Sequence, residues 1–441
     1  MKVFIMDTDG EGMGIDLAVR ALTADHEVHY WLPTETNGEV PPYGEGLVER
    51  PLEWKPEMDW AELIVLTGNS TYQTPLAEYF GNGYPIFGAN AKGAELELDR
   101  GKGQEVLRTY GIKTLPYTVV DSVEDAIAYI LKEDAAFVMK PWGGDADKAM
   151  TCVPQDVDEA IYTLQKWDRE GKFKGQLMLQ EKVDGVEMGI AGWFGPGGWN
   201  EALEESFEHK KFLNDDLGEN TGEMGTVIRH VRKSKLFDEI LEPLTDYLHY
   251  INYVGDCSVN CIIDSKGRPW PLEFTMRLGW PDFCIRQEVV KGDPVQWMKD
   301  LLEGKDTLEV YNKIALGVLL AHGDFPRSKD PVKTWAGFPI SGITAENLSH
   351  LHFQQMQSGK ASKVVAGKVK NLESELTAGT YVMVVSGSGG TVERASEEAY
   401  EVAWQIKWPG NLMMRTDIGK RLESELPKLQ RFGFAEGMRY G

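Results

Sequence analysis

The chain has 441 residues, of which 42% are hydrophobic, and a formal net charge of −23. A chain of this length buries a large core and divides into roughly three domains, since a domain usually takes about 100–200 residues. The acidic balance argues against a large nucleic-acid-binding surface, because phosphate backbones are bound by clusters of Lys and Arg. No segment has membrane-spanning length and the N-terminus lacks the apolar run of a signal peptide, so we expect a cytoplasmic protein without membrane contact.

The first 92 residues alternate short apolar strands with helical segments. Strands are expected at residues 3–6, 27–31, 63–66 and 86–88, and a helix from Ile15. This alternation predicts an α/β domain with a Rossmann-like parallel sheet over residues 1–92. The glycines of residues 10–14 follow the first strand, where phosphate-binding turns occur, but a tight strand-to-helix turn is the favoured interpretation of a lone glycine cluster.

A second domain is expected over residues 93–305. It should begin with a charged helix over residues 93–110 and continue into an α+β subdomain, the flap, over about 117–190. Later elements should be a strand at 188–194, a hairpin at 258–275 and helices at 236–250 and 287–302. Within the flap, the expected strands are 117–120, 137–140, 149–153 and 177–180, and the expected helices follow Ser122 and span 156–168.

Residues 306–441 are rich in Gly, Thr and Val and alternate in polarity over 381–385. They predict a small antiparallel, β-rich lobe that contains a helix over residues 396–406, with Ser396 as its N-cap. The four cysteines lack the paired spacing of a metal site and are expected to be reduced thiols.

The segment 216–225 has neither the period of a strand nor that of a helix, and it contains three glycines among polar side chains. Glycine lets backbone N–H groups approach a ligand, and the polar side chains supply directed hydrogen bonds. The cations of the preceding residues 208–211 suit a substrate with a carboxylate or phosphate. An ordinary surface loop is the alternative interpretation.

Two further segments suit a nucleotide. Lys140 ends an apolar strand and precedes a glycine-bearing loop with a second lysine, Lys148, an arrangement that can enclose phosphates. Residues 180–187 can present backbone groups to a purine and Glu187 to a ribose hydroxyl. The alternatives are a solvated turn with incidental lysines, and an ordinary strand followed by an Asp-Gly turn.

The strand that ends the second domain carries polar side chains on one face. Alternation places Glu273, Thr275 and Arg277 together, and the antiparallel partner strand adds Asn260. Mg²⁺ favours such hard oxygen ligands. A half-exposed sheet face with a Glu/Arg pair is the alternative.

The order of these pieces along the chain resembles the ATP-grasp superfamily and, within it, the phosphoribosylamine-glycine ligases. The likeness extends to residues 415–419, Arg-Thr-Asp-Ile-Gly, which are similar to a motif near the end of that family. The resemblance implies a central ATP-grasp fold. It also implies ATP and Mg²⁺ as cofactors, with Mn²⁺ as a second candidate metal, and amino-acid and amine substrates that are joined through an acyl phosphate.

The resemblance also assigns roles to individual residues. The residues assigned to ATP are Arg100, Lys140, Lys148, Glu181, Lys182, Val183 and Glu187. Those assigned to the substrates are Asn220, Thr221, Gly222 and Glu223. Lys210 and Arg277 are assigned to catalysis, and Glu273, Thr275 and Asn260 to the metal.

Departures from the family concentrate around the substrates. Arg100 replaces a phosphate-binding lysine, and Thr275 replaces an asparagine that ligates the metal. Glu223 replaces a glycine and Trp280 an acid, while the N-terminal turn is acidic where the family has Gly-Gly-Arg-Glu-His. By charge repulsion these changes predict an altered amine acceptor, unless Glu223 merely points to solvent.

Three functions are therefore compared. The first is an ATP-dependent carboxylate-amine ligase with a diverged acceptor, and the second is a phosphoribosylamine-glycine ligase of purine synthesis. The third, favoured by Thr275, is a nucleotide-binding regulatory protein with weak or no catalysis; Lys140, Glu187, Glu273 and Arg277 oppose it. The sequence leaves the oligomeric state open.

Overall fold

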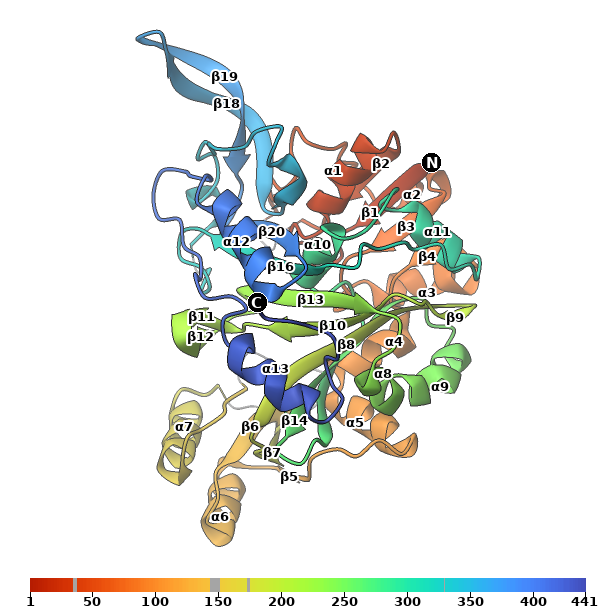
Figure 1. Ribbon diagram of the computed structural model, residues 1–441, viewed down its shortest axis with the longest axis vertical. Coiled ribbons are helices and arrows are strands. Elements are labelled where there is room, and N and C mark those ends of the chain that lie inside the picture. Colours follow the sequence, from red (N-terminus) through yellow and green to blue (C-terminus); the bar gives the residue numbers. More distant parts are fainter. Residues whose placement is uncertain (35–37, 143–150, 173–174, 329) are drawn as a thin grey trace.

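A computed structural model describes residues 1–34, 38–142, 151–172, 175–328 and 330–441 (Figure 1). The N-terminal region is a four-stranded parallel sheet in the order β2-β1-β3-β4. Apolar runs such as Val3–Met6 are fully buried because helices pack on the sheet. This confirms the predicted Rossmann-like domain core. Its elements are β1 (Lys2–Met6), α1 (Ile15–Thr23), β2 (Glu27–Trp31), α2 (Lys55–Trp60), β3 (Leu63–Leu66), α3 (Gln73–Gly81) and β4 (Ile86–Phe87).

Two helices, α4 (Ala91–Leu98) and α5 (Arg100–Thr109), replace the single helix predicted over residues 93–110. Asp99 adopts an extended conformation between them, and its carboxylate accepts hydrogen bonds from the backbone N–H groups of Gly101 at 2.8 Å and Lys102 at 3.1 Å. The single-helix prediction was wrong because Asp99 caps a new helix instead of continuing the old one.

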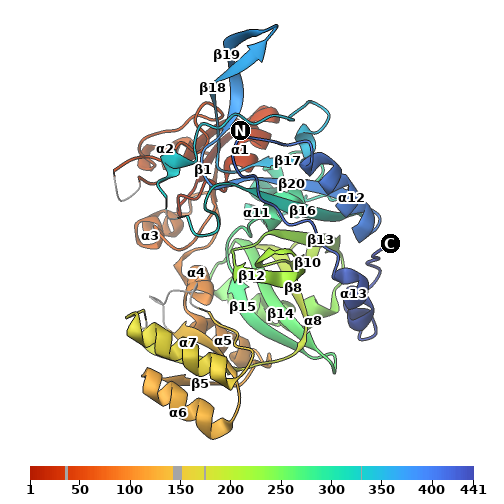
Figure 2. The same cartoon turned by 90° about the vertical axis from the view of Figure 1, so that its left-hand side faces the viewer.

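The flap is a small antiparallel sheet in the order β5-β7-β6 with two helices packed together (Figure 2). Its elements are β5 (Tyr117–Val120), α6 (Val123–Glu133), β6 (Phe137–Trp142), α7 (Val157–Arg169) and β7 (Gln176–Glu181). The predicted strand 149–153 lies partly outside the described residues; within them, Cys152 forms an isolated bridge with Met139.

A nine-stranded sheet forms the centre of the molecule, and its main path runs β15-β14-β8-β10-β13-β16-β20-β17. All pairings in it are antiparallel. Its strands are β8 (Gly185–Gly195), β9 (Gly198–Trp199), β10 (Leu203–Glu208), β13 (Gly225–Val231), β14 (Gly255–Asp264), β15 (Pro269–Thr275), β16 (Ile314–Ala321), β17 (Leu351–Phe353) and β20 (Tyr381–Gly389). The sheet continues across residue 305 through the β13–β16 pair, and the division at residues 92 and 305 stays a prediction.

Three predicted helices have different bounds in the structure. The segment 236–250 divides into α8 (Lys235–Ile240) and α9 (Thr245–Tyr250) around Pro243, which has no N–H to donate. The segment 287–302 yields α10 (Asp282–Gln287) and α11 (Gln296–Leu302), separated by Gly292 at φ 75°. The last is α12 (Val392–Ala403), capped by Thr391 and not by Ser396.

The remaining elements are small. Two hairpins, β11 (Lys211–Leu213) with β12 (Leu217–Asn220) and β18 (Met356–Val365) with β19 (Lys368–Thr377), stand outside the main sheet, and α13 (Leu422–Gln430) lies near the C-terminus. The β18–β19 hairpin projects at the end of the molecule opposite the flap (Figures 1 and 2). Among the described residues, no helix combines the length and apolar character needed to cross a membrane. The four cysteines are free, as expected.

A buried arginine ties α10 to the central sheet. Arg286 is 2% exposed, and its guanidinium lies 2.5 Å from Glu204 of β10, 2.7 Å from Asp256 of β14 and 2.6 Å from Asp282 of α10. The indole of Trp193 covers its face at 4.7 Å. Three buried carboxyl groups share the guanidinium of Arg286. Its positive charge offsets their negative charge, which would otherwise cost a large free energy to bury.

We expect Arg286→Met to destabilise the protein strongly, because it leaves three buried carboxylates without a cation. Loss of one partner of a buried ion pair costs about 3–5 kcal/mol. The midpoint of thermal unfolding, followed by circular dichroism, should fall well below that of the control Arg232→Met, whose side chain is 86% exposed. Equal midpoints would contradict this account of the network.

Candidate active site

Lys210 stands where three strands of the central sheet bring carboxylates together. Its ammonium lies 2.8 Å from Glu187 on β8 and 3.1 Å from Glu208 on β10. It also lies 3.8 Å from Glu273 on β15. Burial lowers the pKa of Lys210, but the three carboxylates outweigh burial, and its pKa lies well above the ordinary value. Lys210 is therefore charged at any physiological pH.

The sheet face beside Lys210 gathers oxygen atoms as the sequence predicts. Asn260 pairs with Glu273 in the β14–β15 register, and its Nδ2 donates to Glu208 Oε1 at 3.0 Å. Phe274 and Met276 are buried on the opposite face, which confirms the predicted alternation around Thr275. Gly189 permits this packing, because a Cβ there would lie 2.3 Å from Ser206 Oγ and 2.8 Å from Asn260 Oδ1.

Lys140 lies on β6 and is 7% exposed, as a buried lysine facing the site should be. Its Nζ donates to Gln180 Oε1 on β7 at 2.9 Å. Burial lowers the Lys140 pKa to about 8, against the opposing effect of Glu273 and with help from the nearby cations Arg100 and Lys210. Arg100 itself reaches the flap, where it donates to the carbonyl of Pro141 and the hydroxyl of Thr151 at 3.1 Å each.

The expected hinge follows β7. Glu181 and Lys182 are exposed and Val183 is half-buried, while the backbone N–H of Glu181 is bound to the carbonyl of Pro116. Lys182 Nζ donates to the carbonyl of Pro154 at 3.4 Å. Lys148, the second lysine of the expected flap loop, lies outside the described residues.

The predicted loop 216–225 is partly strand, because residues 217–220 form β12 and pair with β11. Asn220 and Gly222 are exposed, and the Thr221 hydroxyl donates to the carbonyl of Lys210 at 2.9 Å. Arg415 fixes the start of this segment, since its guanidinium donates to Asp216 and Asp417 at 2.8 Å. The C-terminal motif of residues 415–419 thus orients the hairpin beside Lys210.

Glu223 is buried, with 4% exposure, so the interpretation that it points to solvent was wrong. Burial raises its pKa well above the ordinary value, and the negative charges of Glu208 and Asp282 raise it further. The buried carboxylate therefore belongs to the same electrostatic environment as the Lys210 group.

Arg277 is oriented by a residue that the sequence analysis missed. Its Nε donates to Glu97 Oε1 at 3.2 Å, and Glu97 Oε2 accepts from the Met276 N–H at 2.8 Å. Asn69 donates to the same oxygen at 2.8 Å. No local pattern connects residues 180 positions apart, so Glu97 could not be found from periodicity.

The glycine turn after β1 directs its backbone groups inward. Asp7 is 1% exposed and accepts from the N–H of Gly12 at 2.7 Å, from Gly10 at 3.2 Å and from Glu11 at 3.4 Å. The Tyr30 hydroxyl donates to Asp7 Oδ2, the oxygen that also accepts from Gly12, at 2.5 Å. A phosphate-binding turn offers these N–H groups to its ligand, and here an internal carboxylate takes them, which favours the predicted tight turn.

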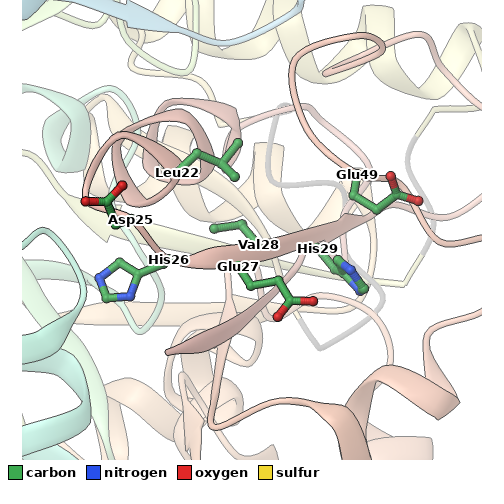
Figure 3. Close-up of a pocket in the computed structure, with 7 residues that line it drawn as sticks. All are labelled: Leu22, Asp25, His26, Glu27, Val28, His29 and Glu49. Carbon is green, nitrogen blue, oxygen red and sulfur yellow. The ribbon is translucent and has the colours of Figure 1, made fainter.

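A surface depression at the edge strand β2 lies apart from this site. Its lining includes Asp25, His26, His29 and Glu49, and it shares no residue with the Lys140 and Lys210 groups (Figure 3). His26 and His29 are bonded to Asp293 at 2.7 Å and Glu57 at 2.6 Å. Both imidazoles thus serve contacts between elements, and the depression is no part of the candidate site.

The donor and acceptor set fits a magnesium nucleotide. Gln180 Nε2 and Arg100 Nε are buried atoms without a hydrogen-bond partner in the part of the chain that the structure describes. Such donors beside Lys140 match the anionic oxygens of a triphosphate. The oxygens of Glu273, Asn260 and Thr275 match the hard ligands that Mg²⁺ prefers.

The chain is similar to known proteins over most of its length. Residues 102–283 match the family model of the phosphoribosylglycinamide synthetase ATP-grasp (A) domain. The chain is 28% identical over 354 residues to a phosphoribosylamine-glycine ligase of Halalkalibacterium halodurans, covering 78% of each chain.

Two solved structures share the fold. The phosphoribosylamine-glycine ligase of Thermotoga maritima matches with a TM-score of 0.69 and 21% identity, covering 95% of this chain and 100% of that one. The biotin carboxylase domain of the 2-oxoglutarate carboxylase of Hydrogenobacter thermophilus, crystallised with MgADP and bicarbonate, matches with a TM-score of 0.61, 12% identity and 99% coverage of both chains. The predicted ATP-grasp fold is confirmed.

We expect Lys140→Met to weaken the binding of Mg-ATP by about 10–100-fold, because a charge-assisted hydrogen bond contributes about 1.5–3 kcal/mol. Since Lys140 has a pKa of about 8 in the free protein, wild-type affinity should fall as the pH rises above 8, where the ammonium loses its proton. The variant should lack this dependence. Calorimetry at pH 7 and pH 9 measures both, with the exposed Lys166→Met as control. Unchanged affinity in Lys140→Met would contradict the assignment.

Proposed function

We propose that the chain, which is similar in sequence to phosphoribosylamine-glycine ligases and shares the ATP-grasp fold, uses ATP to join an amino acid to an amine. The observation that carries the proposal is the convergence of Lys140 and Lys210 on Glu273 at the oxygen-rich face of β14 and β15. Cations there suit phosphate and carboxylate oxygens, and the oxygen face suits their metal. The proposed location is the cytoplasm.

The proposed reaction has two steps. A carboxylate oxygen of the amino acid attacks the γ-phosphorus of ATP, and the bond between that phosphorus and the β-phosphate oxygen breaks. The products of this step are ADP and an acyl phosphate. The amine nitrogen then attacks the acyl carbon, phosphate departs with the bonding electrons, and the nitrogen loses a proton to give the amide.

Each step has a candidate residue. Arg100 and Lys140 would bind phosphate oxygens, and Glu187 a ribose hydroxyl. Glu273, with Asn260 and Thr275, would hold Mg²⁺ or Mn²⁺, which neutralises the triphosphate when bound. Arg277, oriented by Glu97, would stabilise the negative charge of the tetrahedral intermediate, and Lys210 would orient the carboxylate.

Glycine and phosphoribosylamine are the substrate pair that the relatives' names favour, ahead of the changed acceptor expected from the sequence. One specific observation supports the changed acceptor as a second candidate. Asp9 and Glu11 lie close enough to Arg277 to stabilise its charge, and Asp7 occupies the N–H groups of the turn. A phosphorylated acceptor would meet these carboxylates.

ADP release decides between the two acceptors. With glycine and freshly generated phosphoribosylamine, a purine-synthesis ligase should turn over at roughly 10 per second, the median of enzymes. A changed acceptor predicts much slower turnover with this pair than with an uncharged or cationic amine. Glu273→Gln should abolish ADP release with every pair. Sustained ADP release by that variant would contradict the proposed metal site.

We further expect Thr275→Asn to retain or tighten the dependence of ADP release on Mg²⁺, because an amide carbonyl is a better ligand for a hard cation than a neutral hydroxyl. The Mg²⁺ concentration for half-maximal rate is the measurement. A large increase in that concentration would assign Thr275 a role that asparagine cannot fill.

A further inference from the structure

Glu223 differs from the buried acids Glu204 and Glu205 in that no described residue forms a hydrogen bond or ion pair with its side chain. Its Oε1 is buried and receives no hydrogen bond from any residue that the structure describes. By contrast, Glu204 is 2.5 Å from Arg286, and Glu205 accepts from the Ser234 hydroxyl at 2.7 Å. A buried carboxylate with a purely structural role is normally paired, because burying it alone is costly.

Tyr381 provides a second buried polar atom without a hydrogen-bond partner among the described residues, and it packs in the same apolar cluster as Met224, which follows Glu223 in the chain. Tyr381 begins β20 and is 8% exposed. Glu223 is close enough that its charge raises the Tyr381 pKa. Tyr381 packs in an apolar cluster with Met13 of the N-terminal turn, and Trp280 lies against that cluster. The two atoms therefore lie where the N-terminal turn meets the β12–β13 segment.

The surrounding charges select the kind of ligand group that can complete this pair. The carboxylates Glu208 and Asp282 act on Glu223, and the ammonium of Lys210, which also acts on it, is already shared by three acids. An anionic group would be repelled. A group that is cationic and carries several N–H donors satisfies both a carboxylate and a phenol oxygen.

We propose that Glu223 and Tyr381 form a subsite for the primary ammonium group of the amino acid whose carboxylate is activated. This inference rests on the proposed ligase function and adds the recognition of its acid substrate. The nucleophilic amine must be uncharged to attack, so the ammonium held by Glu223 is not the attacking group. It is the α-ammonium, two bonds from the carboxylate carbon, and Glu223 acts as a specificity-determining residue.

Hydroxylamine trapping tests the subsite without knowledge of the acceptor, because hydroxylamine converts any acyl phosphate into a hydroxamate. With Mg-ATP, the wild-type protein should form hydroxamate from glycine far faster than from acetate or glycolate, which lack the ammonium. Glu223→Gln should raise the KM for glycine on the order of 100-fold, as expected for loss of a buried charge pair, and leave kcat less affected. The rates with acetate should not change.

Two further variants make the test specific. Tyr381→Phe, which keeps the ring and removes the hydroxyl, should raise the KM for glycine several-fold. Glu373→Gln changes an acid on β19 whose side chain is 72% exposed and should behave as wild type. Glu223→Asp, which retains the charge, should recover part of the loss.

The results separate this inference from the ligase proposal. Equal use of glycine and acetate by the wild-type protein would overturn the subsite. Wild-type kinetics in Glu223→Gln would also overturn it, because the amide resembles a protonated carboxyl group and carries no charge. If no carboxylic acid yields hydroxamate, the ligase proposal fails, and thermal shift with glycine and glycine methyl ester then decides the subsite alone. Stabilisation of wild type but not of Glu223→Gln by both amines would support it, and identical shifts would refute it.

Discussion

The candidate site depends on one electrostatic constraint, the sharing of the Lys210 ammonium by Glu187, Glu208 and Glu273. Each acid comes from a different strand of the central sheet, so the antiparallel registers fix their separation. Carboxylates this close would repel one another without a cation. Lys210 thus permits an oxygen-rich surface suited to a metal in a protein whose overall charge is already strongly negative.

The unsatisfied atoms divide the site by charge. On the flap side, the buried donors Gln180 Nε2 and Arg100 Nε lie near Lys140 and have no acceptor among the described residues. On the side of the N-terminal turn, the buried oxygens Glu223 Oε1 and Tyr381 Oη have no donor among the described residues. Buried polar groups are normally hydrogen-bonded, so the proposed ligand groups, phosphates on one side and an ammonium on the other, would each complete the half of the site that they face.

Long-range polar contacts give these side chains their orientation. Glu97 of α4 holds Arg277, and Arg415, near the C-terminus, holds the segment that begins at Asp216. Arg286 couples α10 to the strands that carry the acids. Such contacts place loops from distant parts of the sequence on a rigid sheet, which is how a binding site gains a defined geometry.

The sequence by itself determined the parallel N-terminal sheet, the hairpin of Glu273 with Asn260, the buried Lys140 and the ATP-grasp likeness, because each depends on local periodicity or on the order of motifs. The sequence did not predict the helix interruptions at Asp99 and Gly292, because the residues on both sides of each continue a helical pattern. Only the tertiary structure decided that Glu223 is buried and that Glu97 orients Arg277. The reason is that burial and partner choice depend on residues far apart in the chain, which periodicity does not connect.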